Sequence, residues 1–210
     1  MKKTFLALIA VTLVYITCPA QFGILGGVNF SKYEYVSDRK ALISWNAGLL
    51  YRIAKSSSTF AMQPQLTYTG KGAIKYPEID PNNDILKYTN HINYLQLSVP
   101  FIISPKLDDE GTLRFDIGAG PYVANVVSAK SSAESYEGET TTSDFKVGSS
   151  STDDFKPFDA GITMMAGTRI GNISFNVQYD LGLLNVNPVT TAPPLKMRAF
   201  MFNMLVYFGK

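Results

Sequence analysis

The chain has 210 residues, enough for one domain and short for two. It carries 19 basic and 17 acidic residues, and two of the basic ones, Lys2 and Lys3, lie in an N-terminal segment that we expect to be removed. The mature chain is then close to neutral, which argues against nucleic acid as a partner. The single cysteine, Cys18, lies in the same segment, so disulfides, thiolate catalysis and thiolate metal sites are excluded from the mature protein.

Residues 1–20 have the pattern of a secretory signal peptide. A basic start precedes an apolar run at 5–16, and small side chains stand before an expected cleavage site after Ala20. The run is shorter than the roughly 20 residues that a membrane-spanning helix needs. A lipoprotein attached through Cys18 is the other alternative, but the neighbours of this cysteine are poor for that processing. We therefore expect a signal peptide at 1–20 and a single mature domain at 21–210.

Apolar and polar residues alternate with a period of two along the rest of the chain, between segments rich in Gly, Pro, Asn, Asp and Ser. The clearest case begins at Ile173, after which every second residue to Leu183 is apolar and each residue between them is Ser, Asn, Gln, Asp or Gly. Most of the segments have about ten residues or more, as tilted membrane strands do, whereas strands of soluble sheets most often have about five or six. The pattern predicts eight strands, at residues 22–33, 44–53, 59–71, 90–103, 112–126, 158–169, 173–184 and 198–208.

The connections between these predicted strands alternate in length. The short ones are 54–58, 104–111 and 170–172, and the long ones are 34–43, 72–89, 127–157 and 185–197. Bacterial outer-membrane barrels have short periplasmic turns and longer extracellular loops. The sequence therefore predicts an all-β protein, an eight-stranded antiparallel up-and-down transmembrane β-barrel in the outer membrane of a Gram-negative bacterium. Both ends of the mature chain are expected on the side of the short turns.

A soluble lipocalin-like barrel has about the same number of strands but turns its apolar face inward. Two features favour apolar residues on the outside. The polar faces carry mostly Gly, Ser, Thr, Asn and Gln, with few of the Lys and Glu residues of a soluble surface. Aromatic residues lie at or near strand ends on the apolar face, as in interfacial girdles: Trp45, Tyr51, Tyr68, Tyr94, Tyr179, Phe200 and Phe208. The expected lipid face includes Leu95, Leu97, Val99, Phe101, Phe175, Val177, Phe200, Phe202, Met204 and Val206.

Several local phrases resemble the small barrels grouped as PorT-like or outer membrane β-barrel domains. They are GGVNFS at 26–31, NAGLL at 46–50, QPQLTY at 63–68 with GKG at 70–72, NYLQLSVP at 93–100 and GAGPY at 118–122. They cover most of the mature chain in the family's order, although the family commonly has an acidic residue where Gln65 and Gln96 stand. The resemblance implies an outer-membrane location, with membrane lipid, lipopolysaccharide and the barrel insertion machinery as partners. Family members differ in role, and some are tied to protein secretion.

Charged and amide side chains on the polar faces are expected to meet inside the barrel. Three arginines fall toward the periplasmic ends of their strands: Arg52, Arg114 and Arg169. Asp116 is two residues from Arg114 on the same face, which makes these two the expected ion pair. Buried charges in a narrow barrel must be paired and hydrogen-bonded, so the sequence predicts a polar plug. The amides expected around it are Gln63, Gln65, Gln96, Asn176 and Gln178.

The remaining polar residues offer weaker signals. Asp159 and Asp180 lie further out and are expected to form a separate acidic patch. The Ser-, Thr- and acid-rich segment 127–157 is expected to be a solvated loop, with partner binding or cation-bridged contact to lipopolysaccharide as the functional alternatives. His91, the only histidine, is expected at the outer rim.

These observations favour a non-enzymatic membrane protein without a cofactor, either structural or binding a protein partner through its extracellular loops. A small-solute channel is the first alternative, and the narrow interior of an eight-stranded barrel disfavours it. An outer-membrane enzyme that uses His91 is the second alternative.

Overall fold

The computed structural model describes residues 20–34, 39–54, 58–77, 84–150, 152–189 and 194–209. The predicted signal peptide, apart from its last residue, lies outside the described residues. Within the described ranges the regular structure is all strand, and no helix there has the length and apolar character to cross a membrane.

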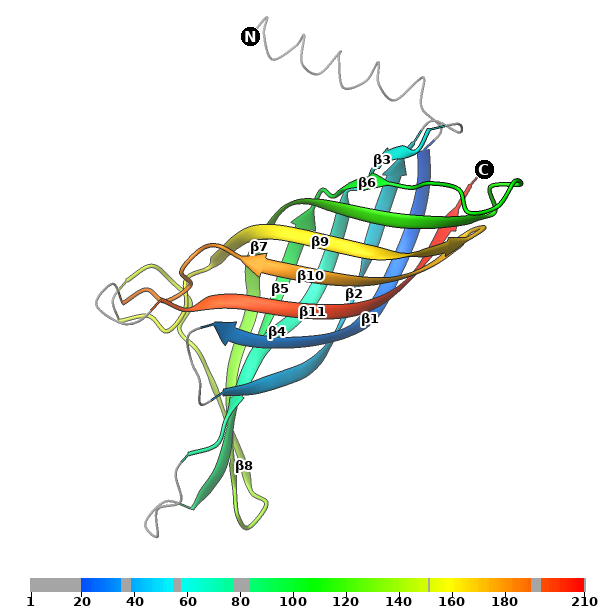
Figure 1. Cartoon of the computed structure of the whole chain (residues 1–210). Helices are drawn as coiled ribbons and strands as arrows, with labels where there is room; N and C mark the ends of the chain where they lie inside the picture. Colours follow the sequence, from blue (N-terminus) through cyan, green and yellow to red (C-terminus); the bar gives the residue numbers. More distant parts are fainter. Residues whose placement is uncertain are drawn as a thin grey trace, which may run out of the picture.

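Eleven strands form one continuous antiparallel sheet (Figure 1). In chain order they are β1 Ala20–Glu34, β2 Arg39–Ile53, β3 Phe60–Met62, β4 Gln65–Lys75, β5 Ile85–Ser98, β6 Phe101–Ile103, β7 Leu113–Ser135, β8 Thr140–Asp144, β9 Phe158–Ile170, β10 Ile173–Gly182 and β11 Lys196–Phe208. β3 and β4 follow each other in one line of the wall, as do β5 and β6, and β8 pairs only with β7 among the described strands. The wall therefore has eight strand positions around the ring, as predicted, because β3 and β4 share one position, β5 and β6 share another, and β8 lies outside the ring.

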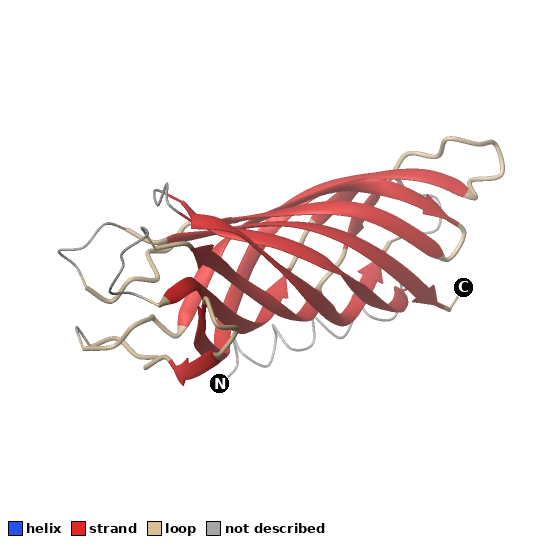
Figure 2. Cartoon of the chain, turned by 90° about the horizontal axis from the view of Figure 1, so that it is seen from below, coloured by secondary structure: helices blue, strands red, loops and turns tan. Residues whose placement is uncertain are grey.

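The sheet closes on itself because β1 pairs with both β2 and the last strand, β11. Phe22 lies opposite Tyr51 on one side and opposite Phe208 on the other. The strands tilt around the wall, as Figure 2 shows. Closure leaves no open edge in the ring, so its backbone N–H and C=O groups bond between strands, as they must where no water is present.

Two prolines break predicted strands into pairs. The predicted strand 59–71 is β3 and β4, separated at Pro64, and 90–103 is β5 and β6, separated at Pro100. Proline has no backbone N–H and cannot donate to the ladder. Its carbonyl still accepts: Gln63 N–H donates to the Pro100 oxygen at 3.0 Å, and Tyr51 N–H donates to the Pro64 oxygen at 2.9 Å.

Strands also extend further than predicted at one end of the barrel. β7 continues to Ser135, where it pairs with β5 and β8, so the predicted loop at 127–157 is in part a sheet that protrudes from the wall (Figure 1). Polar residues lie on both faces of this protrusion, so it lacks the clear alternation from which strands were predicted. We call the protruding parts of β5, β7 and β8, at residues 85–91, 130–135 and 140–144, the ledge.

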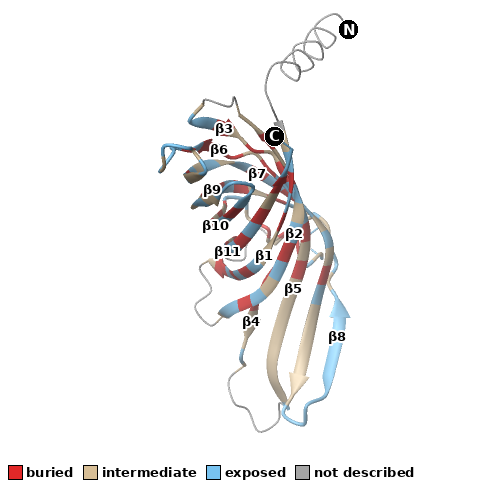
Figure 3. Ribbon diagram, turned by 90° about the vertical axis from the view of Figure 1, so that its right-hand side faces the viewer, coloured by how far each residue is buried: buried red, intermediate tan, exposed pale blue. Residues whose placement is uncertain are grey.

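The two faces of the wall differ as predicted. Along β10, Phe175 is 54% exposed while the adjacent Asn176 is 5% exposed, and the same alternation bands β2 and β11 in Figure 3. Every residue assigned to the lipid face is exposed or half-buried on the outside. The lipocalin-like alternative is therefore wrong. One girdle residue was also misassigned: Tyr94 is fully buried, because it shares the inward face with Ile92 and Gln96 and alternates with Leu95.

The barrel has a short-turn end, with the β2–β3, β6–β7 and β9–β10 connections, and a long-loop end, with the β1–β2, β4–β5, β7–β8, β8–β9 and β10–β11 connections. Phe22, near the start of β1, pairs with Phe208 at the end of β11, so the first and last strands begin and end at the short-turn end, as predicted. The difference in loop length is smaller than expected. The β1–β2 connection spans only 35–38, because both strands extend, and is shorter than the β6–β7 connection at 104–112.

Candidate functional site: the barrel lumen

A buried ion pair crosses the lumen near the short-turn end. Arg52 of β2 donates through Nη1 and Nη2 to the two carboxylate oxygens of Asp116 of β7, at 2.9 and 3.2 Å. Arg52 Nη1 also donates to Gln63 Oε1 at 3.2 Å, and the Tyr207 hydroxyl donates to the same oxygen at 2.9 Å. The two charged side chains are 2% and 0% exposed. The bidentate geometry and the additional amide are what a desolvated charge pair requires.

The predicted partner of Asp116 was wrong. Arg114 is half-buried near the rim and donates instead to the backbone oxygens of Gly111 and Ser104, at 3.4 and 3.2 Å. Arg169 lies opposite Arg114 in the β7–β9 register, and its guanidinium carbon is 5.8 Å from the centre of the Tyr207 ring. Residues two apart on one strand point the same way but stay about 7 Å apart, so a long arginine from across a narrow lumen meets Asp116 more easily.

A second buried charge pair lies closer to the long-loop end. Lys71 of β4 donates through Nζ to Asp180 of β10 at 3.0 Å and to Gln96 Oε1 at 2.8 Å. Gln96 Nε2 donates to the same Asp180 oxygen at 2.8 Å, which closes a three-membered cluster. The ammonium also lies 4.7 Å from the centre of the Tyr122 ring, within the range of a cation–π contact. The predicted acidic patch is therefore wrong, because Lys71 neutralises Asp180.

A chain of amides approaches this second pair from the side of the first. Asn46 Nδ2 donates to Asn203 Oδ1 at 2.8 Å, and Asn203 Nδ2 donates to Gln178 Oε1 at 3.4 Å. Gln178 Nε2 then donates to Asp180 Oδ1 at 3.1 Å. All three amides are buried, as is the predicted Gln65. The expected kinds of residue thus form two charged layers in the lumen, with a chain of amides that bonds to the second layer.

Asp159 lies beside the second ion pair, with Tyr122 between the carboxylate and Lys71. It accepts a hydrogen bond from the Tyr122 hydroxyl at 2.9 Å and is 1% exposed. The Tyr122 ring can reach it because Gly161 lies beneath: a Cβ on Gly161 would lie 2.8 Å from Tyr122 Cε1 and 2.1 Å from the Leu181 carbonyl oxygen. Only a residue without a side chain fits at that position.

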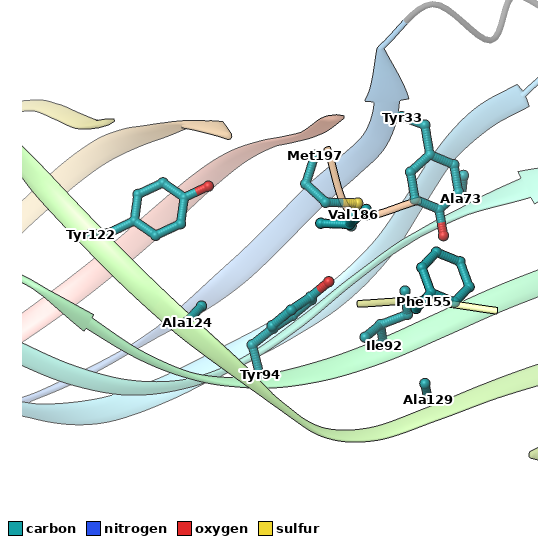
Figure 4. Close-up of a cluster of buried hydrophobic side chains, with 10 residues drawn as sticks. All are labelled: Tyr33, Ala73, Ile92, Tyr94, Tyr122, Ala124, Ala129, Phe155, Val186 and Met197. Atoms are coloured by element: carbon teal, nitrogen blue, oxygen red, sulfur yellow. The ribbon is translucent and has the colours of Figure 1, made fainter. Parts of the chain in front are cut away.

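An aromatic and aliphatic cluster of buried side chains, the mouth cluster, lies toward the long-loop end of the barrel (Figure 4). Eight members come from the wall strands, whereas Phe155 and Val186 come from the β8–β9 and β10–β11 connections. Lys156 N–H donates to the Val186 oxygen at 2.8 Å, so the two connections are joined by their backbones. The members are Tyr33, Ala73, Ile92, Tyr94, Tyr122, Ala124, Ala129, Phe155, Val186 and Met197. The predicted solvated loop at 127–157 therefore contributes buried apolar side chains, Ala129 and Phe155, to this cluster.

Sequence analysis missed several residues of the lumen. Lys71 lies four residues beyond Thr67 on the inward face of β4, so the strand period could have placed it there. Asn46 and Asn203 have the same inward parity on β2 and β11. No local pattern marks Phe155 or Val186, because they lie outside strands and are buried only by tertiary contacts.

His91 shows no partner for acid–base chemistry among the described residues. It is half-buried on β5, lies opposite Lys130 of β7, and its Nε2 has no hydrogen bond. The rim position agrees with the sequence prediction. No group of three or more His, Cys, Asp or Glu side chains in the described ranges is arranged to hold a metal ion.

A closed antiparallel barrel with an apolar outside and a polar inside is the architecture of an integral membrane β-barrel. The chain belongs to the outer membrane protein beta-barrel domain family, whose model matches residues 18–187. It is therefore a protein of the outer membrane. No curated protein sequence matches the chain.

Solved structures of three outer-membrane proteins are similar to the chain over most of its length. Ail of Yersinia pestis has 10% sequence identity and a TM-score of 0.42, with 91% of this chain and 99% of that chain covered. Neisserial surface protein A has 12% identity and a TM-score of 0.47, with 90% and 99% covered. OprG of Pseudomonas aeruginosa has 10% identity and a TM-score of 0.44, with 92% and 98% covered.

Proposed function

We propose that the protein is a sealed, non-enzymatic outer-membrane barrel of the PorT-like type that binds a protein partner at its long-loop end, with that end outside the cell. The local phrases at 26–31, 63–68 and 93–100 support the PorT-like type. The general wiring of bacterial barrels, with short turns in the periplasm, supports the orientation.

The observation that carries the proposal is the filling of the lumen at successive levels. A solute would have to pass the Arg52–Asp116 pair, the Lys71–Asp180 pair and then the mouth cluster. Opening either charged level separates opposite charges that are 0–2% exposed, which is costly in a buried site. A barrel of this kind offers its ends as interaction surfaces, not its interior.

The ledge supports partner binding at the long-loop end. It projects beyond the wall in Figure 1, and β8 is exposed along its whole length in Figure 3. The strand is polar, and its pairing with β7 from Lys130 to Glu134 holds it in a defined form. An ordered, exposed, polar extension is a suitable surface for recognition by another protein.

Conductance across planar bilayers tests the sealed lumen. We expect no stepwise current from the wild type. We also expect none from Phe155→Ala, because this substitution removes one side chain of the mouth cluster and leaves both charged levels in place. Steady steps from the wild type would contradict the proposal and favour a small-solute channel.

Crosslinking in intact cells tests partner binding. A photo-reactive residue at Thr141, exposed on β8, should yield a defined crosslinked protein, while the same residue at Leu107, exposed in the β6–β7 connection, should not yield that product. Identical products at both positions, or none at Thr141, would contradict the proposed interface.

A further inference from the structure

β1 and β11 are neighbours in the barrel (Figure 1). Basic side chains gather on the outer wall at the long-loop ends of these two strands. Lys32 lies opposite Arg198, and Glu34 lies opposite Lys196. These residues alternate with the lumen-facing Tyr33 and Met197, which are buried. The four side chains therefore share the outer face.

The charges of this patch do not balance. Glu34 forms a close ion pair with Arg198, and Arg198 also donates to the Gly182 oxygen at 2.5 Å. No carboxylate of the described residues lies within 4.0 Å of Lys32 or Lys196. Like charges directly opposite each other on neighbouring strands are destabilising, as the cations of Lys32 and Arg198 are here. A bound anion would remove this repulsion.

Two outward lysines of the ledge, at the same end, are matched by acids. On the ledge, Lys87 pairs with Glu134 at 2.7 Å, and Lys130 lies 4.0 Å from Asp144. The β1–β11 patch, in which Lys32 and Lys196 lack such a carboxylate, differs in this respect from the ledge.

An apolar surface continues directly from the patch toward the middle of the barrel. Phe30, Phe200 and Phe202 are exposed, and edge-to-face contacts join Phe202 to the other two, at 6.2 and 5.0 Å between ring centres. Beyond them lies a groove of about 620 Å³, lined among others by Val28, Phe115, Phe175, Val177, Phe202 and Met204. Lys32 and Val28 are four residues apart on β1, or about 13 Å along the strand. That separation suits a headgroup at the patch and an acyl chain in the groove.

We propose that this wall is a binding site for a phosphorylated, multiply acylated glycolipid of the outer leaflet, with its phosphate at Lys32, Lys196 and Arg198 and an acyl chain along Phe30 and Phe202 into the groove. The charge of the patch selects the anionic headgroup, and the adjacent groove selects a lipid over a soluble anion. The site rests on the proposed orientation, because only the outward end of the barrel meets that leaflet.

The test is titration of the purified full-length protein, in micelles of a neutral detergent, with diphosphorylated lipid A. The variant Lys32→Gln/Lys196→Gln should bind about thirtyfold more weakly, since each basic residue near an anionic membrane surface contributes about 1 kcal/mol. The matched control Lys130→Gln/Lys146→Gln removes the same charge at the same end and should bind as the wild type does. Heat-modifiable gel migration shows that each variant is folded.

A second variant moves affinity in the other direction. Glu34→Gln removes the only described carboxylate of the patch and should bind diphosphorylated lipid A more tightly, an outcome that simple loss of structure would not produce. Lipid A without phosphates and inorganic phosphate alone should each bind weakly. Equal affinity of the wild type for phosphorylated and dephosphorylated lipid A, or equal weakening by both double variants, would overturn the proposal. Such a failure would leave the sealed lumen untouched, because conductance measures that property separately.

Discussion

Removing one partner of the Arg52–Asp116 pair should destabilise the barrel far more than removing both. In Asp116→Ala the guanidinium stays buried with only Gln63 as a hydrogen-bonding partner in the layer. Leaving one charge of a buried pair uncompensated costs about 3–5 kcal/mol. Arg52→Met should cost a similar amount by leaving the carboxylate buried. In that variant Gln63 Oε1 loses the hydrogen bond from Arg52 but keeps the one from Tyr207. The lost bond adds only about 1 kcal/mol to the destabilisation.

The double variant carries no uncompensated charge in this layer, and methionine fills much of the volume of arginine. Its loss of stability should therefore be about 3 kcal/mol or more smaller than the sum of the two single losses. The assay is urea unfolding in lipid vesicles, followed by the fluorescence of Trp45. This residue is the only tryptophan and is 55% exposed on the outer wall, where it reports departure from lipid.

A second cycle distinguishes the observed pairing from the one that sequence spacing suggested. Arg114→Met and Asp116→Ala should be additive to within about 0.5 kcal/mol, because Arg114 bonds backbone oxygens near the rim. Additive losses for Arg52 and Asp116, or strong coupling of Arg114 with Asp116, would refute the reasoning.

Three further predictions concern the wall and the ends. In the same unfolding assay, Val177→Arg should cost about 2–4 kcal/mol and Ile173→Arg, nearer the short-turn end, about 0–1 kcal/mol; equal costs would mean that the depth assignment is wrong. Gly161→Ala should cost about 1–3 kcal/mol by overpacking against Tyr122 and Leu181. The control Gly26→Ala, whose Cβ would lie 3.8 Å from the Asn46 backbone oxygen, should cost much less, and a harmless Gly161→Ala would contradict the described packing. Protease added to intact cells should cut within 146–154 and spare 104–112, as judged by fragment masses, and the reverse pattern would invert the proposed orientation.

Much of the fold could be predicted because a barrel wall obeys a local rule. Alternation along residues 173–183 is enough to assign an outer and an inner face, and the structure confirms both. The rule fails where polar residues lie on both faces, as in the ledge, so the start of β5 was placed too late and the end of β7 too early. Alternation also does not predict whether the chain keeps its direction in the wall after a proline, as it does after Pro64 and Pro100.

The lumen could be predicted in composition but not in pairing. Strand parity places Arg52, Asp116 and Gln178 inside, as the structure confirms. Which charges meet depends on the shear of the closed sheet and on reach across the lumen, and neither is written in local spacing. Asp180 was for this reason assigned to an acidic patch when its partner, Lys71, lay on the far side of the ring. Phe155 illustrates the limit, since only the path of a connection brings it into the mouth.

Pairing of the first strand with the last has a kinetic consequence. Until β11 lies beside β1, every shorter piece of the wall has two open edges, and such edges invite pairing with other chains. The contact that closes the ring is also the one most distant in sequence, and contacts of this kind form slowly. The exported chain must therefore be shielded along its full length before any of it can settle in the bilayer. Loss of even the last strand should leave an aggregation-prone ribbon and not a smaller barrel.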